Sequence, residues 1–184
     1  AYNDVQGKNL DEVMADVSGK QPDSVIGNSH AYIPTYNSEK GKKDVRVSEF
    51  YWRAPKSGEV SFSSKMDDWG KIYFGESFDT LEEIISIPSY TTSFNDYGVT
   101  RTVEQGKFYA MKIFNVNAGG GGSAVPGIKY SDEENYAAIA DADAFHPDFP
   151  LGSTVETYVY EPQFIVSKKD SIKLSVSGTD KTEW

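Results

Sequence analysis

The stretch SKMDDWGKIYFG, residues 64–75, places two adjacent acidic residues and a tryptophan between two segments that alternate between apolar and polar residues, as β-strands do. Neighbouring side chains of a trans backbone point to opposite faces, whereas a cis peptide bond would turn the Asp67 and Asp68 carboxylates the same way. Two interpretations follow. The pair either closes a tight turn in water or grips one cation.

Composition bounds the class of protein. The 184 residues are 38% hydrophobic and 14% aromatic, which predicts a single domain over residues 1–184 with one sizeable core. The formal charge of −10 has the wrong sign for nucleic acid or an anionic membrane surface, and it suits a calcium-rich exterior. No apolar run approaches the roughly 20 residues that span a bilayer, so no membrane insertion is expected. The absence of Cys excludes disulfides, thiolate metal sites and a cysteine nucleophile.

Helix signals occur twice. Leu10, Val13, Met14 and Val17 fall at helical spacing after Asn9, a suitable N-cap, which predicts a short helix near the N-terminus. Ser131 followed by Glu134 resembles a capping box and predicts a second short helix over residues 131–140.

The remaining pattern is that of short strands separated by turns. It predicts an all-β protein, an antiparallel β-sandwich with one or two short peripheral helices. The first two long strands, residues 46–53 and 59–64, are expected to form a hairpin-like pair around the turn at residues 54–58. The other expected strands are residues 31–36, 71–74, 82–87, 107–116, 154–160, 163–166 and 171–176.

A glycine run follows one of these strands. Residues 117–123 read Asn-Ala-Gly-Gly-Gly-Gly-Ser. Four consecutive glycines either form a flexible tip or let backbone carbonyls approach a ligand closely, because they carry no side chain.

The order of these motifs resembles a known family. An aromatic strand and a Pro/Gly turn in residues 49–62, the Asp67–Asp68 pair, the Ile-Tyr-Phe-Gly of residues 72–75 and the strand of residues 104–113 follow as in the protective-antigen-type (PA14) β-sandwich. The resemblance covers roughly residues 45–130. Family membership alone does not imply sugar binding, because many members are structural or bind proteins.

The lectin branch of this family, which includes flocculins, epithelial adhesins and bacterial surface (RTX-type) adhesins, holds one Ca²⁺ on an Asp-Asp pair. The resemblance implies that Asp67 and Asp68 are ligands here, completed by the Asn117 side chain and the backbone carbonyls of Gly119 and Gly121. Two carboxylates, an amide oxygen and two carbonyls leave coordination places that vicinal sugar hydroxyls can fill.

The same resemblance implies an extracellular carbohydrate-binding module that is one monomeric part of a longer cell-surface chain. Its partners would be mono- or oligosaccharides of cell-surface glycans. Trp69, Asn115 and Gly120 are candidate sugar contacts, although Trp69 suits the core equally well and strand alternation also allows Asn115 to point elsewhere. Because the glycine run offers few side chains, the expected site is shallow and binds several monosaccharides weakly. The fungal members carry disulfides, so bacterial adhesins are the better relatives.

Other readings remain beside this one. A non-catalytic protein-binding or spacer module with a structural Ca²⁺ is the main alternative. An enzyme is not expected, because adjacent carboxylates cannot flank a glycosidic bond at about 5–9.5 Å. The acidic stretch at residues 141–148 lacks the ligand spacing of an EF-hand and is expected to be a solvated loop. His30 lies in another polar loop, and its side chain is also expected to be solvated.

Overall fold

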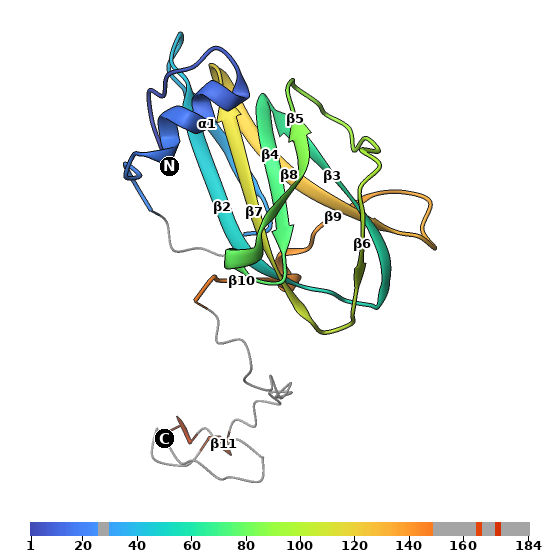
Figure 1. The fold of residues 1–184 in the computed structure, drawn as a ribbon. Coiled ribbons are helices and arrows are strands. Elements are labelled where there is room, and N and C mark those ends of the chain that lie inside the picture. The colour runs from blue at the N-terminus through green and yellow to red at the C-terminus, as the bar shows by residue number, and fades with distance from the viewer. Residues whose placement is uncertain (26–29, 149–164, 167–171, 174–184) are drawn as a thin grey trace. The chain divides into compact units, whose positions relative to one another are not determined.

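A computed structural model describes residues 1–25, 30–148, 165–166 and 172–173 (Figure 1). The chain divides into two compact units, Ala1–Phe149 and Pro150–Trp184. In the second unit, β11 (Ile165–Val166) and β12 (Ile172–Lys173) form an antiparallel pair within two of the expected strands. The strand expected at residues 154–160 lies outside the described residues. A single domain over residues 1–184 stays a prediction.

The first unit is an antiparallel β-sandwich, as the sequence predicts. Sheet I has the strand order β1-β8-β3-β6 with β9 paired to β8, and sheet II has the order β10-β2-β7-β4-β5. The strands of sheet I are β1 (Ile33–Ser38), β3 (Gly58–Asp67), β6 (Thr100–Val103), β8 (Gly120–Tyr130) and β9 (Ala137–Ala138). Those of sheet II are β2 (Asp44–Arg53), β4 (Trp69–Gly75), β5 (Glu82–Ile87), β7 (Phe108–Asn117) and β10 (Ala144–Phe145).

The predicted hairpin of the first two long strands is wrong. β2 pairs along its whole length with β7 in sheet II, whereas β3 pairs with β8 and β6 in sheet I. Both strands still face one core, because Trp52 of β2 packs edge-on against Phe62 of β3 across the gap between the sheets. The turn between them therefore carries the chain from one sheet to the other.

Helix α1 (Leu10–Ser18) confirms the N-terminal helix. Asn9 is its N-cap, and the Asn9 side chain accepts a hydrogen bond from the Glu12 backbone N–H at 2.9 Å. The helix packs through Val13 and Val17 onto Phe114 and neighbouring residues of sheet II, on the face turned away from the core between the sheets. Among the described residues, no helix is long and apolar enough to cross a membrane.

The second predicted helix is wrong. Glu133, rather than Glu134, folds back to accept the Tyr130 N–H at 3.0 Å in a turn, and Lys56 binds the Glu133 carboxylate. The chain then pairs Ala137 with Ile128 as strand β9. Pairing with an existing sheet satisfies the backbone there, and a short isolated helix has little to offset its nucleation cost.

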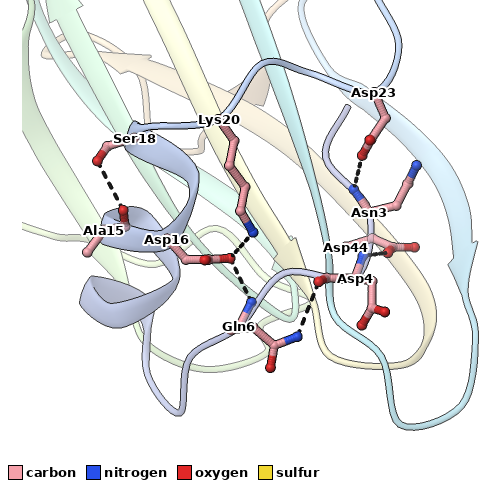
Figure 2. Close-up of polar contacts among 9 residues, drawn as sticks. All are labelled: Asn3, Asp4, Gln6, Ala15, Asp16, Ser18, Lys20, Asp23 and Asp44. Carbon is pink, nitrogen blue, oxygen red and sulfur yellow. Dashed lines mark hydrogen bonds and ion pairs between the residues drawn. The ribbon is translucent and has the colours of Figure 1, made fainter.

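The N-terminal segment lies along the free edge of β2, beyond the short strand β10. Figure 2 shows Asp4 of this segment beside Asp44, the first residue of β2. Tyr2 and Val45 exchange two backbone hydrogen bonds, and the Val5 N–H donates to the Lys43 carbonyl. The Asp44 carboxylate accepts the Asp4 N–H at 3.0 Å. These contacts cover part of an edge strand that would otherwise expose its backbone groups.

Three connections pass between the sheets at one end of the sandwich. They are residues 39–43 from β1 to β2, Asp68 from β3 to β4, and Ala118 and Gly119 from β7 to β8. The strand registers place them together, because Ser38 pairs with Gly120 and Asp44 pairs with Asn117.

Substitution of Gly70, the second residue of β4, tests how closely the chain packs where it enters sheet II. A Cβ at position 70 would meet the Phe114 carbonyl and the Met66 sulfur, so Gly70→Ala is expected to cost about 1–3 kcal/mol of unfolding free energy. Gly19→Ala is the matched control, since no atom lies within 4 Å of its Cβ position, and it should change stability by less than about 0.5 kcal/mol. Urea unfolding of both variants measures the difference, and equal stabilities would contradict the tight passage.

Candidate functional site

The acidic pair lies at the passage from sheet I to sheet II. Asp67 is the last residue of β3, and the peptide bond between Asp67 and Asp68 is cis. The Asp68 N–H donates to the Val116 carbonyl at 3.0 Å, and the Asp68 carboxylate accepts the Ala118 N–H at 2.8 Å. The pair is therefore fixed against the connection between β7 and β8.

The electrostatics of the pair favour a cation. Burial and then the negative charge of Asp68 raise the pKa of the Asp67 carboxyl above its ordinary value. Across residues 1–25 and 30–148, no Lys, Arg or His forms an ion pair with either carboxylate. Two partly buried carboxylates that face each other repel, and a bound cation would remove that repulsion.

The glycine run is an ordered part of sheet I. Gly120, Gly121 and Gly122 begin β8 and pair with residues 36–38 of β1, so the flexible-tip interpretation is wrong for these three residues. Gly119 and Gly120 have φ angles of +132° and +82°, which side-chain-bearing residues rarely adopt. The chain therefore turns sharply at Gly119 and Gly120 and is paired with β1 from Gly120 onward.

Asn117 holds this turn from the end of β7. Its side-chain oxygen accepts the Gly119 N–H at 3.0 Å, and its amide donates to the Gly120 carbonyl at 2.8 Å. The side chain lies against Gly122, where an added Cβ would come within 2.6 Å of the Asn117 Cβ. An amide oxygen has two lone pairs, so Asn117 retains one for a further partner.

The five predicted metal ligands are thus brought to one end of the sandwich. Asp68 touches the turn through Ala118, Asp67 pairs with Ser123 of β8, and Asn117 forms the turn that contains Gly119 and leads to Gly121. No group of three His, Cys, Asp or Glu side chains in the described part of the chain lies close enough to hold a metal. A cation here would need the amide and backbone oxygens, and this all-oxygen set fits a hard cation such as Ca²⁺.

Asn115 does not serve as the predicted sugar contact, because it is fully buried between the sheets. Its amide nitrogen lies 3.0 Å from the Asp67 carbonyl and 3.3 Å from the Trp69 carbonyl, bracketing Asp68. Its oxygen accepts the Tyr36 hydroxyl at 2.8 Å. Asn115 therefore fixes the backbone on both sides of Asp68. Strand alternation was the signal that sent it inward.

Tyr36 is the residue that the sequence analysis missed. It reaches from sheet I to Asn115 in sheet II, and the guanidinium carbon of Arg46 lies 4.7 Å from the centre of its ring. Burial raises the pKa of the Tyr36 hydroxyl well above its usual range, so this group is a hydrogen-bond donor at neutral pH. No local pattern shows this contact, because 79 positions separate Tyr36 from Asn115.

Trp69 is partly a core residue, as one of its two interpretations predicted. It is half-buried and packs against the cluster under α1, on the outer face of sheet II. Its contact with sugar stays a prediction, as does that of Gly120.

Comparisons with known proteins find relatives in structure alone. No family model and no curated protein matches the sequence. The PA14 domain of the antifreeze protein MpAFP superposes with a TM-score of 0.61 at 13% identity, over 82% of this chain and 89% of that one. This chain has the PA14 fold. A second PA14 structure, a sugar-binding domain from an RTX adhesin, matches with a TM-score of 0.50 at 14% identity, over 79% of this chain and 94% of that one.

The acidic stretch after β9 has a structural role in this PA14 sandwich. Asp141 begins a short 3₁₀ helix, Asp141–Asp143, and its carboxylate accepts the Ala31 N–H at 2.9 Å. Asp143 lies 3.5 Å from Arg53 of β2, and His30 lies 3.4 Å from Asp141. Asp141, Asp143 and His30 therefore join chain segments, whereas a solvated loop was expected.

The Tyr36–Asn115 hydrogen bond is testable through stability. Asn115→Ala removes the partner of the Tyr36 hydroxyl and the side-chain hydrogen bond to the Asp67 carbonyl, and it should cost about 2–3 kcal/mol of unfolding free energy. Tyr36→Phe should cost about 1 kcal/mol, and the double variant less than the sum of the two. Tyr73→Phe is the control, since no hydrogen bond of its hydroxyl is found among the described residues. Strictly additive losses in urea unfolding would contradict the coupling.

Proposed function

We propose that this PA14 sandwich is a calcium-dependent carbohydrate-binding domain of an extracellular cell-surface adhesin. Asp67, Asp68, the Asn117 side chain and the carbonyls of Gly119 and Gly121 would hold the Ca²⁺. The observation that carries the proposal is the contact of Asp68 with Ala118. It joins a carboxylate pair that has no cationic partner among the described residues to the turn whose neutral oxygens would complete the cation site. The similar PA14 structure described as a sugar-binding domain from an RTX adhesin supports the ligand class.

The donor set leaves room for a ligand. Ca²⁺ takes 6–8 oxygen ligands, and the five protein groups leave one or more places for water or vicinal sugar hydroxyls. When bound, the cation would supply direct coordination of sugar hydroxyls. The protein's own part is to orient the carboxylates, which Asn115 and the Val116 carbonyl do by fixing the backbone beside them.

The side chains around the site set the expected affinity. Gly119 to Gly122 contribute no side chain that could enclose a sugar ring, so binding would depend on hydroxyl geometry and would be weak for several monosaccharides. Trp69 and Gly120 are the proposed sugar contacts. The adjacent carboxylates cannot take the separated acid and base positions of a glycosidase, so the proposed role is non-catalytic.

Loss of one carboxylate should abolish calcium and sugar binding together. Wild-type protein is melted in EDTA, in Ca²⁺, and in Ca²⁺ with fucose, glucose or mannose. A ligand at 100 times its Kd stabilises by about 2.7 kcal/mol, so each addition should raise the wild-type Tm. Asp68→Asn should show neither shift, because it retains the acceptor for Ala118 but loses the charge that binds the cation.

Asp79→Asn is the control for that variant, since Asp79 is exposed in the short helix Phe78–Thr80 of the loop between β4 and β5, and it should retain both shifts. A calcium shift without any sugar shift would support the alternative, a protein-binding or spacer module with a structural Ca²⁺. A sugar shift of equal size in EDTA would refute coordination through the cation.

The Asn117 assignment is testable at two neighbouring glycines. A methyl group at position 122 would collide with the Asn117 side chain, whereas at position 121 the nearest atom, Thr35 Cγ2, lies 4.0 Å away. Gly122→Ala should therefore weaken calcium binding at least about tenfold, and Gly121→Ala should leave it within about twofold. Calorimetric titration with Ca²⁺ measures both. Equal affinities of the two variants would remove Asn117 from the ligand set.

A further inference from the structure

The connection between β1 and β2 lies directly beside residues 117–120, which we call the glycine turn. Both of its ends are paired to that turn, Ser38 to Gly120 and Asp44 to Asn117. In between, the Gly41 nitrogen lies 4.0 Å from where a Cβ of Gly119 would be. Because Gly119 to Gly122 carry no side chains, residues 39–43 are the neighbouring segment that can supply charged side chains on this flank.

These five residues are strongly basic for such an acidic chain. They read Glu-Lys-Gly-Lys-Lys and carry a net charge of +2, three Lys less one Glu, within a chain of net charge −10. Lys42 is committed locally, since its ammonium group lies 3.0 Å from the Glu39 carboxylate and 3.8 Å from that of Asp4. We name residues 39–43 the lysine loop.

Lys40 is an exposed lysine of this loop whose side chain has no ion pair or hydrogen bond within the described residues. The Lys43 side chain also lacks a partner among these residues, but it is partly buried. The Lys40 Cα is about 3.8 Å from that of Gly41, whose nitrogen lies 4.0 Å from the Cβ position of Gly119, and a lysine side chain is long and flexible. Lys40 can therefore reach a ligand seated over the glycine turn.

We propose that the site prefers acidic saccharides, with a uronic-acid carboxylate paired to Lys40 while ring hydroxyls bind the cation. This inference rests on the proposed function. A bound Ca²⁺ would neutralise Asp67 and Asp68, which leaves the lysine loop as the dominant charge beside the sugar. The preference would be electrostatic and therefore sensitive to salt.

Glucuronate and glucose form the test pair, because they differ at the carboxylate. Calorimetric titration in saturating Ca²⁺ at low ionic strength should give a Kd for glucuronate about two- to fivefold lower than for glucose, as expected for one exposed charge pair. In Lys40→Gln, the Kd for glucuronate should rise to that for glucose, and the Kd for glucose should stay as in wild type. Lys107→Gln, which removes a charge just before the far end of β7, should leave the ratio as in wild type.

A second readout separates the lysine from the cation. Raising the salt concentration to 0.5 M should shrink the wild-type ratio toward that of Lys40→Gln, and the Tm of the variant in EDTA should match wild type. A glucuronate preference that persists in Lys40→Gln would come from the cation alone and would overturn the proposal, as would equal affinity of wild type for both sugars. If calcium binds and neither sugar does, the proposed function itself fails, and this inference fails with it.

Discussion

The amide of Asn115 fixes the chain at the point where it leaves sheet I and enters sheet II. Its hydrogen bonds to the Asp67 and Trp69 carbonyls span the single residue that separates β3 from β4. The partner that orients this amide, Tyr36, belongs to the opposite sheet. The position of both carboxylates therefore depends on a contact that exists only when the two sheets have packed together.

The space between the sheets has two different fillings. Toward one end, Trp52, Phe62, Phe74 and Tyr109 form a continuous aromatic cluster. Eight residues along the same β2–β7 ladder, Asp44 faces Asn117 and the filling becomes polar. Apolar burial supplies most of the stability of such a sandwich. The polar end is thus free to present oxygen atoms, and its buried groups bond mainly to one another.

Sequence alone predicted the fold class, most strand positions and α1, since strand alternation and an N-cap are local signals. The resemblance to the PA14 family also brought Asp67, Asp68 and Asn117 together. Sequence alone failed where contacts with residues distant in the sequence determine the local structure. Glu134 suggested a helix, but the outcome depended on pairing with β8. Asn115 followed its strand alternation inward, yet its partner, Tyr36, could not be read from any nearby residue. Gly120 to Gly122 form a strand because they pair with β1, which the glycine run itself does not indicate.

The N-terminal segment has a mechanical consequence. Its hydrogen bonds lie side by side on Lys43, the last residue of the lysine loop, and on Val45, the second residue of β2. A force pulling the chain at Ala1 along the edge of β2 would load those bonds in shear, together, before it reached the β2–β7 ladder. The edge covering would then yield before the β2–β7 ladder. The sheets, and the carboxylate pair between them, would keep their shape while that covering detached.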